Sequence, residues 1–253
     1  MTDKETPVFD VDIRMRLMDR NGGCFVLRSR IRTMDARLVL FGPSGSGKTL
    51  TLQAIAGLAT PDEGFIRVNG RTLFDSKEKV NLPARKRNVG FLFQDYALFP
   101  HMTVRENVRF GAARLFHRIS KEASDRVEEL ISVCGLERVA KSLPGELSGG
   151  QRQRTALARG LAAEPEMLLL DEPFSALDRP LRLRLRQSVF DILQEYGLPL
   201  VLVTHDKEEM ESFAQSVAVY DQGRVVALEQ GGASPLDFAG VEAAMERAYG
   251  AEA

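Results

Sequence analysis

The chain of 253 residues has no tryptophan, only two cysteines and almost no net charge. Two cysteines, Cys24 and Cys134, do not make a disulfide framework or a cysteine-rich metal site, and we predict that both are buried thiols. A net charge of -1 creates no overall field that attracts nucleic acid, so we expect no nucleic-acid partner. The polar N-terminus has no signal-peptide core, and no apolar run approaches the roughly 20 residues that span a bilayer. A membrane role therefore requires a partner protein.

Four short apolar runs each lead into polar residues. RLVLFG precedes Ser44, VGFLF precedes Gln94, EMLLL precedes Asp171, and PLVLVT precedes His205. Such runs are typical of parallel strands buried on both faces, and ligands bind beyond the carboxyl ends of these strands. We therefore predict an α/β fold with a mostly parallel sheet and four polar groups at one edge. The alternative is that each polar residue merely ends its strand.

Other patterns predict the remaining organisation. The dipeptide Asn69-Gly70 lies between two strand-like runs and predicts a hairpin, hence an antiparallel piece beside the parallel sheet. Helical patterns between about residues 95 and 160 predict a helical subdomain. It is inserted in the core of a domain that we expect to extend over residues 1–230. LRLRLR, residues 181–186, alternates like a strand, but Pro180 and the spacing of the leucines favour a helix. Residues 231–253 predict a short helical tail without a regulatory domain.

GPSGSGKT matches the full G-x-x-x-x-G-K-[ST] pattern of a phosphate-binding loop, between a predicted strand and a predicted helix. Its backbone N–H groups surround phosphates, and the dipole of the following helix adds to the attraction. Lys48 is expected to reach the β and γ phosphates, and the hydroxyl of Thr49 to bind Mg²⁺. The predicted nucleotide-binding residues of this loop are Gly42, Pro43, Ser44, Gly45, Ser46, Gly47, Lys48 and Thr49.

Carboxylates and two further polar residues complete a hydrolytic set. Asp171 and Glu172 follow the run LLL, so one carboxylate is expected to hold Mg²⁺ and the other to activate a water molecule. Gln94 is expected to coordinate Mg²⁺ or orient the water, and His205 to bond the γ-phosphate. Alone, either of these two residues would more often be a satisfied group at a strand end.

A second glycine-rich turn, LSGGQ, lies about a hundred residues after the first. Ser148 is a natural helix N-cap, Gln151 stands three residues later as in a capping box, and Gly149 and Gly150 let backbone N–H groups approach an anion. One ATP does not easily lie in both loops of one chain. We therefore predict a head-to-tail homodimer in which each ATP contacts the phosphate loop of one chain and LSGGQ of the other.

Taken together, GPSGSGKT, Gln94, LSGGQ, LLLDEP, SALD and His205 resemble the ATP-binding subunit of an ABC transporter in their order and spacing, over about residues 8 to 230. This resemblance implies that Glu172 is the catalytic carboxylate, that His205 is the switch histidine and that Asp178 lies at the dimer contact. It also implies ATP and Mg²⁺ as cofactors, membrane permease subunits and an extracytoplasmic binding protein as partners, and a peripheral location on the cytoplasmic face of the membrane. The family usually stacks an upstream aromatic residue on adenine, and this chain offers only Phe25 in that stretch.

The stretch GRTLFDSKEKVNLP looks most like the molybdate and sulfate branch of bacterial importer ATPases, while spermidine, iron and sugar importers share ALFPHMTV. A DNA-repair or chromosome-structuring ATPase would need long coiled-coil insertions, and no such heptad segment is present. A translation factor of the same superfamily would carry each motif twice. An importer ATPase for an oxyanion is therefore the leading expectation.

Overall fold

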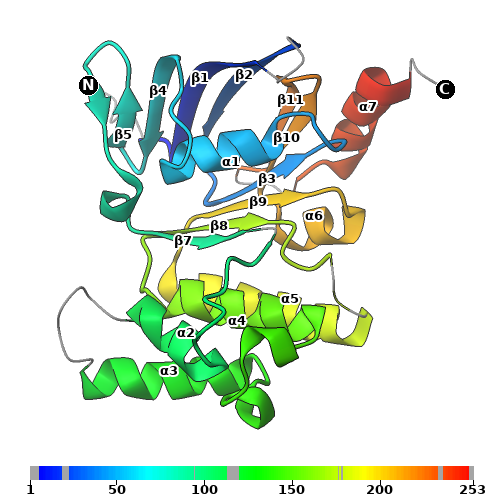
Figure 1. Cartoon of the computed structure of the whole chain (residues 1–253). Helices are drawn as coiled ribbons and strands as arrows, with labels where there is room; N and C mark the ends of the chain where they lie inside the picture. The colour runs from blue at the N-terminus through cyan, green and yellow to red at the C-terminus, as the bar shows by residue number, and fades with distance from the viewer. Residues whose placement is uncertain are drawn as a thin grey trace. The chain divides into compact units, whose positions relative to one another are not determined.

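The computed structural model describes residues 6–18, 23–93, 95–112, 120–175, 177, 179–232 and 236–250. It consists of two compact units (Figure 1). The first comprises Met1–Arg87 and Pro199–Ala253, and the second Asn88–Leu198. No helix in the described ranges combines the length and the apolar character needed to cross a membrane.

The described residues of the first unit form nine strands. They are β1 (Phe9–Met18), β2 (Cys24–Thr33), β3 (Arg37–Phe41), β4 (Glu63–Val68), β5 (Arg71–Asp75), β6 (Val80–Asn81), β9 (Leu200–Thr204), β10 (Ser216–Asp221) and β11 (Arg224–Gln230). Their order in the sheet is β6-β5-β4-β1-β2-β11-β10-β3-β9. Three α-helices and a 3₁₀ turn belong to the same unit. These are α1 (Lys48–Ala56), α6 (Lys207–Phe213), α7 (Phe238–Tyr249) and the turn Ala84–Lys86.

This sheet mixes parallel and antiparallel pairing, and β11 pairs in parallel with β2 but antiparallel with β10. β3 pairs in parallel with β9 and with β10, as the apolar runs predict. From β6 to β2 every pair is antiparallel, which is more than the predicted hairpin. The cause is visible in β1, where Phe9, Val11, Ile13 and Met15 are buried while the residues between them are not, a pattern of strands with one solvated face. The hairpin prediction itself is confirmed, since Asn69 and Gly70 both have positive φ angles, 48° and 75°.

In the second unit, the part of the chain that the structure describes forms two parallel strands and four α-helices. They are β7 (Val89–Leu92), α2 (Val104–Ala112), α3 (Lys121–Val133), α4 (Gly149–Ala162), β8 (Met167–Asp171) and α5 (Arg179–Tyr196). Two 3₁₀ turns, Glu137–Val139 and Pro144–Glu146, lie between α3 and α4. α2 packs against α3 and α4 (Figure 1). The helical prediction for LRLRLR is confirmed, because Leu185 and Val189 are buried on one face of α5 and Gly197, at φ 59°, follows its end.

The two cysteines differ in environment. Cys134 is buried at the end of α3, and burial raises the pKa of its thiol to about 12, as predicted for an inert thiol. The prediction for Cys24 is wrong, because this thiol is exposed. Cys24 begins β2 and pairs with Met18, which is 70% exposed, so it lies at the solvated end of a two-stranded ribbon.

A buried arginine closes the end of the helix that follows the phosphate loop. Arg87 is 1% exposed, and its guanidinium donates to the carbonyl oxygens of Ala54 and Ile55, each at 2.8 Å, and to that of Leu82 at 2.8 Å. Burial lowers the pKa of Arg87 to about 10, so the group stays charged at neutral pH. The cation therefore satisfies the last carbonyl oxygens of α1 and complements the negative end of its dipole.

Arg87→Met is expected to lower the free energy of unfolding by about 2–4 kcal/mol, because three buried carbonyl oxygens lose their donor. The measurement is urea unfolding followed by circular dichroism. Arg85→Met, two residues away and exposed, is the matched control and should change stability by about 0.5 kcal/mol or less. Equal stability of the two variants would contradict this account of Arg87.

Candidate nucleotide-binding and hydrolytic site

The phosphate loop spans the six residues between β3 and α1. Gly42 and Gly47 have φ angles of 150° and 103°, where side chains are disfavoured. A Cβ on Gly47 would lie 2.6 Å from Cδ1 of Leu27, and one on Gly42 would lie 2.4 Å from the carbonyl oxygen of Tyr220. Both glycines are therefore required by the close packing of the loop against β2 and β10.

Lys48 is folded back over this loop. Its Nζ donates to the carbonyl oxygens of Gly42 at 2.7 Å and Pro43 at 2.6 Å, and the residue is 5% exposed. Gly47 is the N-cap of α1 and supplies no side-chain acceptor, and the first turn has no acidic residue. The first N–H groups of α1 and a cation thus lie together at the positive end of a helix dipole, which is the arrangement that binds phosphate.

His205 enters the same sheet edge from the neighbouring strand. Phe41 pairs with Thr204, so the residues that follow them, Gly42 and His205, leave the parallel pair at the same level. Thr204 Oγ1 donates to buried Glu209 Oε2 at 2.6 Å, and Asp206 caps α6 by accepting from the Glu209 N–H at 3.0 Å. His205 is exposed in this fixed turn. The structure of the first unit therefore brings the phosphate loop and His205 to one edge.

A cavity of about 460 Å³ adjoins the loop at Gly45. Phe25, Arg28 and Arg224 are among its lining residues. The ring of Phe25 also lies 3.4 Å from the position of a Cβ on Gly47, so the aromatic residue packs against the phosphate loop. Phe25 is thus close enough to the loop to meet the base or sugar of a bound nucleotide.

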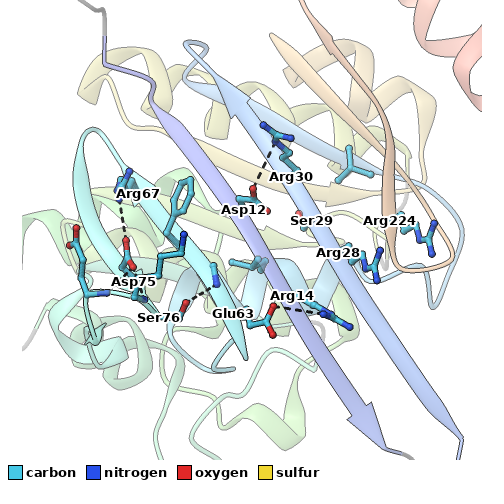
Figure 2. Close-up of a pocket in the computed structure, with 16 residues that line it drawn as sticks. Asp12, Arg14, Arg28, Ser29, Arg30, Glu63, Arg67, Asp75, Ser76 and Arg224 are labelled. Atoms are coloured by element: carbon cyan, nitrogen blue, oxygen red, sulfur yellow. Dashed lines mark hydrogen bonds and ion pairs between the residues drawn. The ribbon is translucent and has the colours of Figure 1, made fainter.

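A second cavity, of about 940 Å³, lies on the exposed face of the antiparallel strands and shares Arg14, Arg28 and Arg224 with the first (Figure 2). Its lining includes no residue of the phosphate loop. Two ion pairs lie among its lining residues, one between Arg67 and Asp75 at 3.1 Å and one between Arg30 and Asp12 at 3.9 Å. Phosphate recognition needs the N–H groups of the loop and Lys48, so the smaller cavity beside Gly45 is the better candidate for a nucleotide site.

The carboxylate pair lies in the second unit, at the end of β8. Asp171 is the last residue of the strand and is 4% exposed. Glu172 has a φ angle of 46°, a left-handed conformation that is costly for a residue with a side chain. Its carbonyl oxygen accepts from Ser175 Oγ at 3.0 Å and from Gln153 Nε2 at 3.4 Å. The backbone of Glu172 is thus held in a strained turn, which turns its side chain away from the path of the strand.

Gln153 is a residue that sequence reasoning missed. It is 2% exposed on α4, the helix that begins with the signature loop, and it links that helix to the carbonyl oxygen of Glu172. Gln153 stands two residues after Gln151 and lies on the buried face of α4. This position is the signal that could have identified it. Through this contact the position of α4 affects the turn that carries the carboxylate.

The capping box predicted for LSGGQ is confirmed. Ser148 Oγ accepts from the Gln151 N–H at 3.3 Å, and Gln151 Oε1 accepts from the Ser148 N–H at 2.8 Å. Arg154 further fixes the helix start, since its guanidinium donates to the carbonyl oxygen of Cys134 at 2.6 Å. Ser148 is exposed, and a Cβ on Gly149 would meet no atom within 4 Å. This helix N-terminus is therefore rigid, open to a ligand and free of side-chain obstruction at Gly149.

Two predicted residues, Gln94 and Asp178, lie outside the described residues. The oxygen donors expected for Mg²⁺ are otherwise Thr49, in the first turn of α1 in the first unit, and Asp171 in the second. Hydroxyl and carboxylate oxygens suit this hard cation. Within the described ranges no cluster of three or more His, Cys, Asp or Glu side chains could hold a metal by itself, so a Mg²⁺ ion would need oxygens from the nucleotide as well.

A glycine-rich loop at the head of a helix, with its lysine and a parallel sheet edge, defines a P-loop nucleotide-binding protein. The chain belongs to the ABC transporter family, whose model matches residues 33–175. Among curated proteins it is 48% identical over 192 residues to the sulfate/thiosulfate import ATP-binding protein CysA of Synechocystis, and 47% identical over 190 residues to the Fe(3+) ions import ATP-binding protein FbpC 2 of Pectobacterium atrosepticum. These matches cover 76% and 75% of this chain but 52% and 53% of the relatives. The chain thus spans about half the length of the curated relatives it matches.

Solved structures agree with this assignment. The dimeric structure of a bacterial ABC transporter cassette superposes with a TM-score of 0.74 at 29% identity, covering 88% of this chain and 97% of that one. A post-hydrolysis state of the same cassette, bound to ADP and Pi, matches equally well. The predicted fold class, an α/β P-loop core with an antiparallel region and helices, is confirmed.

Proposed function

We propose that this chain is the ATP-hydrolysing subunit of an ABC importer, which closes as a homodimer around two ATP molecules and drives a membrane permease. The observation that carries the proposal is Lys48, buried in its glycine loop at the positive end of α1. Membership of the ABC transporter family and the names of the import ATP-binding relatives support it. A peripheral location at the cytoplasmic face of the membrane, and a binding protein on the other side, belong to the same proposal.

In this proposal the residues of the first unit bind the phosphates. Lys48 leaves the carbonyl oxygens of Gly42 and Pro43 and donates to the β and γ phosphates, while the loop N–H groups cradle them. The hydroxyl of Thr49 would hold Mg²⁺, which when bound would neutralise phosphate charge. Phe25 lies beside the base or sugar. His205, exposed at the same sheet edge, donates to the γ-phosphate.

The residues of the second unit act on the water and close the site. Glu172 accepts a proton as the water oxygen bonds to the γ-phosphorus, and the bond from that phosphorus to the β-γ bridging oxygen breaks, which leaves ADP and phosphate. Asp171 and Gln94 complete the Mg²⁺ and water contacts. The N–H groups at Ser148, Gly149, Gly150 and Gln151 bind the γ-phosphate held by the other chain of the dimer.

For the cargo we propose a tetrahedral oxyanion. The stretch GRTLFDSKEKVNLP motivates molybdate or tungstate, while the sulfate/thiosulfate relatives favour sulfate among the oxyanions. Iron is the alternative, because Fe(3+) import relatives are as similar to this chain, at 46–48% identity. Spermidine and sugars are weaker alternatives as cargo, because only the shared stretch ALFPHMTV supports them.

Reconstitution with the permease and binding protein tests this function. ATP hydrolysis in vesicles is expected to rise when the binding protein is loaded with molybdate, tungstate or sulfate, and to stay at its basal rate with polyamines or sugars. The same anions should not alter hydrolysis by the isolated chain. The measurement is phosphate release, with Glu172→Gln vesicles as the background. Stimulation by ferric iron alone would replace the cargo and keep the ATPase assignment, whereas no hydrolysis in any preparation would refute the function.

A further inference from the structure

The C-terminal helix α7 makes a direct polar contact beside the phosphate loop. Tyr249, the last residue of the helix, donates its hydroxyl proton to the carbonyl oxygen of Tyr220 at 2.8 Å. The same carbonyl oxygen would lie 2.4 Å from a Cβ on Gly42, and the Tyr249 hydroxyl 3.0 Å from it. A residue about two hundred positions downstream thus packs against the first glycine of the loop.

Tyr220 connects this contact to the elements beneath the loop. Its hydroxyl bonds to Thr51 Oγ1 on α1 at 3.0 Å and to Ser29 Oγ on β2 at 2.6 Å, and all three residues are buried. Val219, the residue before it, pairs with Phe41, the residue before Gly42. The end of β10 is therefore held by the hydrogen bonds of the Tyr220 side chain and by its pairing with β3. The carbonyl oxygen of Tyr220 is held in addition by the hydroxyl of Tyr249.

α7 itself is anchored at several points. Asp237 caps the helix by accepting from the Ala239 N–H at 3.1 Å, and Val241 and Ala244 are buried against β10 and β11. Lys207, two residues after His205, forms an ion pair with Glu242 at 3.0 Å. The helix thus contacts the end of β10 through Tyr249 and the segment after β9 through Glu242.

We propose that Tyr249 is a positioning residue of the phosphate loop, which holds the Tyr220 carbonyl against Gly42 and so fixes the Gly42 carbonyl to which Lys48 binds. This inference rests on the proposed ATP-binding function. The geometry supports it because Lys48 Nζ lies 2.7 Å from the carbonyl oxygen of Gly42, the residue that packs against Tyr220 and Tyr249. Burial and the nearby Asp221 carboxylate raise the pKa of Tyr249 to about 12, so its hydroxyl remains a donor at physiological pH.

Tyr249→Phe removes the hydroxyl and keeps the ring. Because one hydrogen bond contributes about 0.5–1.5 kcal/mol, the KM for ATP is expected to rise about three- to tenfold with kcat unchanged. The affinity for inorganic tripolyphosphate, which has no base or sugar, should fall by the same factor, since the effect passes through the phosphate loop. Amide hydrogen exchange of residues 42–49 without nucleotide should become faster. The measurements are steady-state kinetics, calorimetric titration and exchange mass spectrometry.

Two controls separate positioning from general stability. Tyr196→Phe removes a hydroxyl that accepts from Arg126 in the second unit, and Glu242→Gln weakens the ion pair of α7 without touching Tyr249. Both should leave the KM and tripolyphosphate binding of the wild type unchanged. A lower melting temperature for Tyr249→Phe with unchanged KM, tripolyphosphate affinity and exchange would overturn the inference while the proposed function stands. A wild-type chain that binds neither ATP nor tripolyphosphate would overturn both.

Discussion

Glu172→Gln is expected to bind ATP with wild-type affinity and to hydrolyse it about 10²–10⁴ times more slowly. The amide keeps the shape of the side chain but cannot accept the proton from water, which corresponds to about 3–5 kcal/mol of barrier. The turn should survive, because Ser175 and Gln153 bind the backbone carbonyl of Glu172 and not its side chain. With hydrolysis blocked, ATP should accumulate in a closed dimer. Phosphate release and size-exclusion chromatography with ATP measure the two effects.

Glu195→Gln is the matched control for this variant. Glu195 is an exposed carboxylate on α5 in the same unit, so its loss should leave hydrolysis at the wild-type rate. A Glu172→Gln protein that turns over ATP as fast as this control would refute the role of Glu172 as the base.

Mixing two inactive chains is expected to restore part of the activity. Lys48→Ala removes the cation of the phosphate loop, and Ser148→Arg places a large side chain at the signature loop, so each homodimer should lose nearly all hydrolysis. In a mixed dimer one site contains both defects and the other contains neither, because its loops come from opposite parents. We expect up to about half the wild-type rate per mixed dimer if the two sites act independently. Phosphate release over a series of mixing ratios measures this.

Ser148→Asn separates the two roles of this serine. Asparagine also caps helices well, so the start of α4 should remain intact and the arginine variant can be compared with a folded, small-side-chain control. Strong ATP hydrolysis by Ser148→Arg alone would argue against a site shared between chains. So would an inactive mixture in which exchange of subunits has been demonstrated.

Much of the fold was predictable because its signals are local. The apolar runs of β3, β8 and β9 are buried on both faces, whereas β7 buries only alternate residues, and the Ser148 capping box is encoded within four residues. The extent of the antiparallel region was harder to predict, because the alternation of β1 indicates one solvated face but does not identify its neighbours, and β1 pairs with β4 across a long sequence separation. Cys24 was misassigned for the same reason, since its exposure depends on its place at the end of a strand pair.

The site shows the same division. The phosphate loop is a continuous motif, and its geometry follows from its glycines and the helix behind it. The contacts of Gln153 with Glu172 and of Tyr249 with Tyr220 join residues that no short pattern connects. They depend on side chains meeting in three dimensions, so only the structure reveals them. The roles of Gln94 and Asp178 remain predictions from the motif order.

The folded-back lysine has a consequence for selectivity. Lys48 Nζ is bonded to the carbonyl oxygens of Gly42 and Pro43, so those oxygens compete with an incoming anion for the same protons. A ligand can replace these carbonyl oxygens only if its own oxygens are better hydrogen-bond acceptors. The oxygens of ionised phosphates are better acceptors than peptide carbonyls. Weak or singly charged anions gain little from this exchange and leave the loop as it is. We therefore expect Lys48 to favour binding of a polyphosphate chain over the chloride and carboxylates of the solution.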